Sequence, residues 1–453
     1  MFFKKDSENK TGVKTSAKKN YMSGKEIREI AKANAKEMRR LEKAKRMPLP
    51  ESAYTTEMKD PNNILEVENL HSYFFTDQGV VKAVNGVTFN VPSNATVGVV
   101  GESGCGKSVT SMSVMRLLQG PSGQIVEGQI RFRVSEYKRD INGKFIPVYE
   151  RDENGEIVYA PMTDKGGFPI LDENGKPKQG PKQLVNERGM GVYEQEEKVY
   201  DIAKMPIKEM YRLRGRQMSM VFQEPMTSLN PVFTIGNQLD EVTLLHVPGA
   251  TKEIAKARSI EMLNLVGIAM PERVYASYPH ELSGGMRQRV MIAMALAGEP
   301  RLIIADEPTT ALDVTIQAQI LDLFNDLKNK INSSILLITH DLGVIAEMAD
   351  YVVVMYAGRI IEMGTASEIF HKPCHPYTQG LQKSKPTMKS NEKKLFNIPG
   401  NVPNPIDMPN YCYFKERCTQ CIGKCSGEYP GMVQVSPTHF VSCHLYTGEK
   451  KED

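Results

Sequence analysis

The stretch GESGCGKS at residues 101–108 constrains the fold of this chain more than any other part of its sequence. It follows the apolar run ATVGVVG (95–101), which we expect to be a strand, and it opens the helix-like stretch KSVTSMSVMRLL. A glycine-rich turn between a buried strand and a helix can wrap successive backbone N–H groups around a phosphate. In that setting Lys107 is expected to reach the β- and γ-phosphates of a nucleotide, and Ser108 to offer its hydroxyl to Mg²⁺. Cys105 is interpreted as a small filler of the loop rather than a reactive group.

Short apolar runs alternate with helical stretches from residue 64 to residue 370, a pattern that predicts an α/β domain. Five of these runs are almost continuously apolar, as in a sheet that is covered on both faces. They lie at 95–101, 217–222, 301–306, 334–339 and 351–356. The runs ILEVENLHSYFF and AVNGVTFNV alternate instead, which favours a half-exposed antiparallel sheet.

Polar groups stand at the ends of three predicted strands. The strand in RLIIADEP ends in Asp306 and Glu307, and burying two carboxylates there would be costly without a nearby cation. We expect Asp306 to hold Mg²⁺ through water and Glu307 to polarise the water that attacks the nucleotide. His340 ends the next strand as a candidate contact of the γ-phosphate. Gln223 occupies the same kind of position and could bind Mg²⁺ or the water.

A second anion site is predicted at HELSGGMRQRV, residues 280–290. Ser283 can cap the helix that follows, and Gly284 and Gly285 free the backbone, so that the first N–H groups of the helix point outward. The chain therefore carries two phosphate-binding devices that are far apart in sequence.

Together these motifs resemble the nucleotide-binding subunits of ABC transporters over residues 64–370, because every motif stands in the family order. The resemblance implies that residues 101–108 are the Walker A loop, Gln223 the Q-loop, and residues 282–286 the signature motif. It also implies that LIIADE is the Walker B strand with the catalytic Glu307, ALD (311–313) the D-loop, and His340 the H-loop. Phe74 falls where the family stacks an aromatic ring on adenine, and Tyr73 points to the opposite face of a strand. The nucleotide contacts implied in this way are Phe74, Gly101, Glu102, Ser103, Gly104, Cys105, Gly106, Lys107, Ser108, Val109, Gln223, Ser283, Gly284, Gly285, Asp306 and Asp313.

In that family two cassettes pair head to tail, and each ATP lies between the Walker A loop of one and the signature motif of the other. The resemblance thus implies that residues 283–285 serve the γ-phosphate of a partner's nucleotide. Catalysis would fall to Glu307, His340 and Gln223, and Mg²⁺ to Ser108, Gln223 and Asp306. The implied fold is a P-loop ABC ATPase domain with a mixed sheet core, an antiparallel β subdomain and a helical subdomain.

Three further stretches resemble the oligopeptide and dipeptide importers of the family: EPMTSLNP (224–231), HKPCHPYTQGL (371–381) and IPGNVPNP (398–405). That resemblance implies an ATPase that powers peptide uptake together with a homologous second ATPase subunit, two permeases and an extracellular peptide-binding protein. The chain would then be peripheral on the cytoplasmic face of the membrane, and a homodimer remains open. Nickel importers share the extension and are the alternative. A non-transport ABC ATPase acting on nucleic acid is disfavoured, because such proteins usually carry two ATPase domains or a long coiled coil, and no nucleic-acid partner is expected.

Five of the seven cysteines lie near the end of the chain, and a reducing compartment favours metal binding over disulfides for such a cluster. Cys412, Cys418, Cys425 and Cys443 have the spacing of the peptide-importer branch, which implies that they are ligands of a [4Fe–4S] cluster. Cys421 departs from this pattern, since its C-x2-C pair with Cys418 would also suit tetrahedral zinc. A set of thiols without metal is the third alternative.

The two remaining regions are expected to be peripheral. Residues 1–50 carry fifteen Lys/Arg and six Asp/Glu, a net charge of +9 in a chain of +3 overall. We interpret residues 1–60 as a basic tail, partly helical or disordered, with a basic arm near anionic lipid as the alternative. The start MFFKKDSENK has no apolar leader, which favours a location inside the cell.

Within the expected nucleotide-binding domain (61–370), residues 136–197 are predicted to be an inserted array of β-hairpins. Three Asn-Gly pairs in it suggest type I′ turns, in which both central residues have positive φ. Residues 371–453 form the expected cysteine-rich extension.

Overall fold

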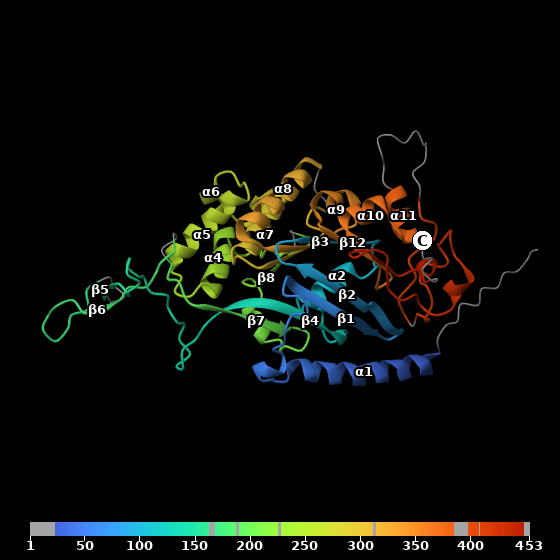
Figure 1. The fold of residues 1–453 in the computed structure, drawn as a ribbon, viewed down its shortest axis with the longest axis horizontal. Coiled ribbons are helices and arrows are strands. Elements are labelled where there is room, and N and C mark those ends of the chain that lie inside the picture. The colour runs from blue at the N-terminus through green and yellow to red at the C-terminus, as the bar shows by residue number, and fades with distance from the viewer. Residues whose placement is uncertain are drawn as a thin grey trace, which may run out of the picture.

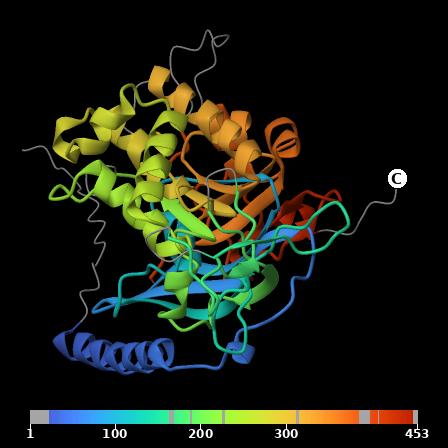
Figure 2. The ribbon, with the colours of Figure 1, turned by 90° about the vertical axis from the view of Figure 1, so that its left-hand side faces the viewer.

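The computed structural model describes residues 23–162, 168–186, 190–224, 228–310, 314–384, 397–406 and 408–447. In these residues a central mixed sheet lies between a group of helices on one side and an antiparallel sheet on the other (Figures 1 and 2). The predicted α/β architecture is confirmed.

The central sheet has eight strands in the described residues, in the order β13-β14-β12-β11-β3-β10-β9-β8. Their bounds are β3 Thr96–Val100, β8 Met218–Val221, β9 Leu302–Asp306, β10 Ser334–Ile338, β11 Tyr351–Tyr356, β12 Arg359–Thr365, β13 Val433–Gln434 and β14 Phe440–Val441. The five apolar runs of the sequence become the parallel strands β8, β9, β10, β3 and β11. Along β9, Ile303 and Ala305 pack into one hydrophobic core while Leu302 and Ile304 pack into the other. The sheet is thus covered on both faces, as its apolar composition predicts.

The antiparallel sheet has the strand order β2-β1-β4-β7. Its strands are β1 Asn63–Thr76, β2 Gly79–Pro92, β4 Gly123–Tyr137 and β7 Gln195–Asp201. Val67 and Phe89, which are partners across β1 and β2, are both buried against the central sheet. The two alternating runs of the sequence therefore form the half-exposed sheet that they predict.

Most helices gather on the other face of the central sheet (Figure 1). Their bounds are α4 Ile235–His246, α5 Lys252–Leu265, α6 Pro271–Ala276, α7 Gly284–Leu296, α8 Val314–Ile331, α9 Leu342–Met348, α10 Ala366–His371 and α11 Pro376–Lys383. The short helix α2, Lys107–Val114, follows β3 and ends earlier than the sequence suggested, because Arg116 takes a positive φ of 55°. Short 3₁₀ turns lie at Glu51–Ala53, Glu209–Arg212, Pro279–Glu281, Gly423–Ser426 and His444–Tyr446. Among the described residues, no helix combines the length and the apolar character needed to cross a membrane.

Residues 24–46 of the predicted basic tail are helical, which is one of the two states that the sequence left open. They form the helix α1, Gly24–Arg46, which starts with a capping box between Ser23 and Glu26 and lies along the antiparallel sheet (Figures 1 and 2). The buried Asn34 donates its Nδ2 to the carbonyl of Thr76 at 2.8 Å. Composition could not show this docking, because it depends on a polar contact with a distant strand rather than on large apolar residues.

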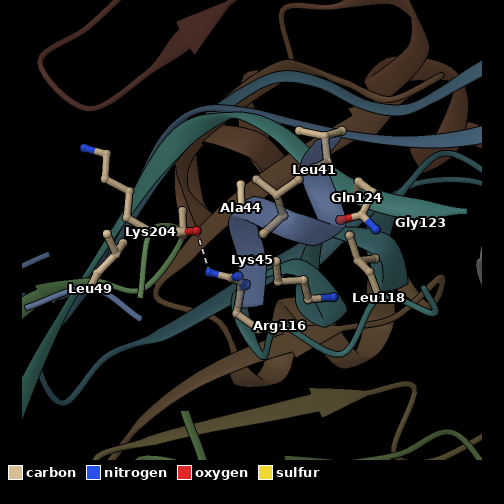
Figure 3. A pocket seen from close by; sticks show the side chains of 11 residues that line it. Leu41, Ala44, Lys45, Leu49, Arg116, Leu118, Gly123, Gln124 and Lys204 are labelled. Carbon is tan, nitrogen blue, oxygen red and sulfur yellow. Dashed lines mark hydrogen bonds between the residues drawn. The ribbon is translucent and has the colours of Figure 1, made fainter. Parts of the chain in front are cut away.

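A pocket of about 280 Å³ lies between α1 and the antiparallel sheet. Figure 3 shows Leu41, Ala44 and Lys45 of α1 around this pocket together with Leu118 and Arg116. Burial lowers the pKa of Arg116 to about 10, and its guanidinium donates to the carbonyls of residues 202, 203 and 205. The guanidinium is therefore satisfied by the backbone despite its burial.

The insert between β4 and β7 is a chain of hairpins that extends away from the body of the molecule (Figure 1). It contains β5, Tyr159–Pro161, and β6, Gln179–Pro181. The predicted hairpins are present, but the prediction of type I′ turns is wrong. Positive φ is confined to the glycine of each Asn-Gly pair: Gly143, Gly155 and Gly175. The aspartate two residues before each asparagine explains the difference, since Asp140 accepts the N–H groups of Asn142 and Lys144 in its own side-chain turn.

Candidate nucleotide-binding site

The phosphate-binding loop joins β3 to α2, with the strand before it and the helix after it that the motif requires. Gly106 caps α2 with a φ of 102°, and a Cβ at this position would lie 2.3 Å from the carbonyl oxygen of Ala83. Only glycine fits there. Cys105 is fully buried and burial raises the pKa of its thiol, so that the side chain fills space as an uncharged group.

Lys107 and Ser108 begin α2 beside the end of β9. The Nζ of Lys107 donates to the carbonyls of Gly101 and Glu102, at 2.8 and 3.1 Å. The hydroxyl of Ser108 donates to Oδ1 of Asp306 at 3.0 Å. Burial raises the pKa of Asp306, whereas the hydrogen bond from Ser108 lowers it. A cation between these two oxygen groups would offset the cost of burying the carboxylate, and such hard oxygen ligands suit Mg²⁺.

Glu307 is the centre of a second group of side chains. Its carboxylate accepts from Nε2 of Gln223 at 3.1 Å and lies 3.2 Å from Nδ1 of His340. Its φ of 46° is in the left-handed region, which is costly for a residue with a side chain. The structure thus brings together the three residues for which catalytic roles are expected.

Thr310 is a further member of this group that the sequence reasoning missed. Its hydroxyl donates to Oε2 of Glu307 at 2.9 Å. The only sequence signal is the pair of threonines that follows the two carboxylates, and which hydroxyl turns back depends on the turn itself. Asp313, the predicted D-loop residue, lies outside the described residues.

Phe74 and Tyr73 have different surroundings on β1. Phe74 is half-buried, and its ring lies so close to Gly123 that a Cβ there would be 2.8 Å from it. The hydroxyl of Tyr73 donates to Oδ1 of Asn85 at 3.2 Å and forms a second hydrogen bond with Nδ1 of His71 at 2.9 Å. Phe74 therefore stays the candidate for adenine, since Tyr73 already has polar partners.

The serine-glycine turn begins α7 as predicted. The hydroxyl of Ser283 accepts from the N–H of Met286 at 3.4 Å, and Ser283 and Gly284 are exposed. A Cβ on Gly284 would meet no atom within 4 Å. Across the described part of the chain, no hydrogen bond or ion pair joins residues 283–285 to the phosphate-binding loop. The second predicted anion site, at residues 283–285, is therefore not covered at Gly284 by other parts of the described chain.

Four cysteine thiols of the extension gather at one place. Cys412, Cys425 and Cys443 are buried, Cys418 is half-buried, and all are free thiols. Burial raises the pKa of Cys412 to about 12, and its three neighbours act on it in the same direction. Cys421, by contrast, is exposed.

Comparison with known proteins identifies the family of this chain. The family described as "ABC transporter" matches residues 84–159 and 189–310, and "Oligopeptide/dipeptide transporter, C-terminal region" matches residues 361–425. The oligopeptide transport ATP-binding protein AppD of Bacillus subtilis is 41% identical over 86% of this chain and 99% of its own length. The chain belongs to the ABC transporter family. The oligopeptide and dipeptide transport ATP-binding proteins OppD and DppD of the same organism are 43% and 41% identical, each over 84% of this chain and over 88% and 94% of their own lengths.

Membership of the ABC transporter family confirms the predicted P-loop fold and the assignment of the chain as an ATPase. The family pattern leaves out residues 160–188, which lie within the predicted insert. The hairpin strands at 160–188 thus lie outside the part of the chain that the cassette family matches.

The geometry of the thiols bears on which metal group this ABC subunit could hold. A tetrahedral zinc site needs sulfur atoms about 3.8 Å apart. In the described residues, no three of these four sulfur atoms lie within 4.8 Å of one another. Three possible metal ligands meet that closely at a different place, Glu362, Cys374 and His439. The four gathered thiols therefore do not form a preformed tetrahedral zinc site in the described residues.

Proposed function

We propose that this chain is the ATP-hydrolysing subunit of an importer that takes up oligopeptides or dipeptides through separate permease subunits. The observation that carries this proposal is the match of residues 361–425 to the C-terminal region of the peptide transporters. Relatives named for oligopeptide and dipeptide transport also match nearly from end to end.

In the proposed site, ATP binds with its phosphates in the loop at residues 101–108 and its adenine against Phe74. Lys107 then leaves the carbonyls of Gly101 and Glu102 to contact the β- and γ-phosphates. Ser108, Asp306 and Gln223 hold Mg²⁺, which when bound neutralises charge that develops on the phosphates.

Hydrolysis in this proposal depends on Glu307. Its carboxylate accepts a proton from water as the water oxygen bonds to the γ-phosphorus and the bond to the β–γ bridging oxygen breaks. ADP and inorganic phosphate then leave. His340, Gln223 and Thr310 orient the carboxylate through the contacts described above.

In this proposal the second anion site, at residues 283–285, completes the nucleotide site of a partner subunit. Ser283 and Gly284 are exposed, Gly285 is half-buried, and none of the three contacts the phosphate-binding loop in the described part of this chain, which favours binding of the partner's γ-phosphate. We propose a homologous second ATPase subunit as that partner, with a homodimer as the alternative. Two permeases docked near residues 224–239 and an extracellular peptide-binding protein complete the assembly, so that the chain lies on the cytoplasmic face of the membrane.

The thiols of Cys412, Cys418, Cys425 and Cys443 are proposed to hold a [4Fe–4S] cluster. The full-length chain purified without oxygen should then contain about four iron and four sulfide per molecule. Cys412→Ser is expected to remove most of both, because this thiol is buried among the other three. Cys421→Ser is the matched control. Cys421 lies beside Cys425 but is exposed and stands outside the proposed ligand set, so this variant should leave the iron content unchanged. Equimolar zinc in place of iron, or an equal loss from both variants, would contradict the proposal.

Uptake measurements test the transport function. Cells that lack this chain are expected to lose uptake of labelled dipeptides or oligopeptides and to regain it with the wild-type chain. They should not regain it with Glu307→Gln. Restoration of Ni²⁺ uptake without peptide uptake would instead support the nickel importer.

A further inference from the structure

We propose that Arg417, in the cysteine-rich extension, is a positioning residue of the phosphate-binding loop and sets the affinity of the site for ATP. The inference rests on the nucleotide site proposed above, because it concerns how that loop is held.

Arg417 forms a bidentate contact with the phosphate-binding loop at residues 101–108. Its Nη1 and Nη2 donate to the two carboxylate oxygens of Glu102 at 2.7 and 2.9 Å. The side chain of Arg417 is 7% exposed and that of Glu102 is 27% exposed, so the pair is largely shielded from water. The hydrogen bond with Glu102 raises the pKa of Arg417. A shielded fork of this kind is stronger and more directional than a surface ion pair.

The guanidinium is itself fixed from the other side. Its Nε donates to the carbonyl of Pro399 at 2.8 Å, and its remaining N–H groups reach Ile398 and the hydroxyl of Tyr356, at 3.4 and 3.3 Å. All five donors of the arginine are therefore used. The fork cannot turn away from Glu102 without losing contacts to the body of the protein.

A second tether acts on the same residue of the loop. The N–H of Glu102 donates to the hydroxyl of Tyr377 at 2.9 Å. Tyr377 lies in α11 and packs against Tyr356 and Phe414, with ring centroids 4.8 and 5.4 Å away. Side chain and backbone of Glu102 are thus both held by residues that follow the common cassette in sequence.

The contacts that fix Glu102 also affect Lys107, the lysine proposed to contact the phosphates. Glu102 is part of the loop that wraps the phosphates, and before ATP binds its carbonyl accepts from Lys107. A displacement of Glu102 therefore shifts both the backbone of the loop and the position from which Lys107 starts toward ATP. Arg417 directly precedes Cys418, which is one of the gathered thiols. The extension therefore acts on the nucleotide site through a contact between residues 315 positions apart in sequence.

A double-mutant cycle on the full-length chain tests the inference, with MgATP affinity measured by calorimetry. Arg417→Gln and Glu102→Gln are each expected to weaken binding by about tenfold, within the range common for coupled sites. The double variant should be no weaker than either single one, because both changes break the same contact. Arg359→Gln is the matched control. The Arg359 guanidinium stacks 4.1 Å from the ring centre of Tyr429 and forms no hydrogen bond or ion pair with Glu102 in the described residues, so this variant should change affinity less than twofold.

Two results would overturn the proposal: unchanged affinity in either single variant, or losses that add in the double variant. Glu102→Gln keeps the test valid if Arg417→Gln unfolds, because it breaks the contact from the more exposed loop side. Lys107→Ala separates this inference from the site itself. If Lys107→Ala binds ATP normally, the proposed nucleotide site is wrong, whereas a loss in Lys107→Ala alone refutes only the role of Arg417.

Discussion

Glu307→Gln is expected to slow ATP turnover by the assembled transporter by about 10²- to 10⁴-fold, the range for loss of a general base. The amide keeps the shape of the side chain and can still accept from Thr310, but it cannot take the proton of the attacking water. Binding of MgATP should stay within about twofold of wild type, since Glu307 has no role in holding the phosphates. Phosphate release and calorimetry measure the two quantities separately.

Glu347→Gln makes the same chemical change at an exposed position of α9 and should leave turnover unchanged. If turnover of Glu307→Gln remains near the wild-type rate, the assignment of the base is wrong. If binding falls together with turnover, the residue holds ATP rather than activating water.

Ser283→Arg in both ATPase subunits should reduce turnover by about 10²- to 10³-fold, as expected when donors to a transferring phosphoryl group are lost. The arginine side chain would occupy the open space in front of α7, where the partner's γ-phosphate is proposed to bind. ATP binding by the separate chain should not change, because residues 283–285 do not contact its own phosphate loop in the described structure. Unchanged ATP binding by the separate chain together with reduced turnover by the assembled transporter would indicate a nucleotide site that is completed by a second subunit.

Thr251→Arg is a suitable control for the loss of a helix cap. Thr251 caps α5 through the N–H of Ile254 and is exposed, so both variants lose about 1 kcal/mol of capping. Normal turnover with Ser283→Arg in both subunits would refute the composite site.

Much of the fold was accessible from sequence because its signals are local. Continuous apolar runs predict the parallel strands, and the glycine spacing of the loop predicts the turn between β3 and α2. The meeting of Gln223, Glu307 and His340 follows from their positions at the ends of neighbouring strands.

The features that escaped prediction depend on contacts between distant parts of the chain. The docking of α1 depends on Asn34 and a carbonyl of β1, and neither has a recognisable pattern. The predicted turn type of the hairpins was wrong because a nearby aspartate side chain accepts hydrogen bonds from the backbone of the turn. Arg417 stands among charged residues of the extension, and only the folded chain shows that it reaches Glu102.

The strand order of the central sheet has a consequence for biosynthesis. β3 pairs with β10 and β11, which begin more than 230 residues later, and the outer side of β12 is covered by β14 at Phe440–Val441. The middle of the sheet therefore stays incomplete until β10 and β11 have been synthesised, and one edge remains open until residues 440–441 have emerged from the ribosome. Such long-range pairing folds slowly and exposes unpaired strand edges in the meantime. Nascent chains stalled before residue 440 should consequently engage holding chaperones, whereas the completed polypeptide should release them.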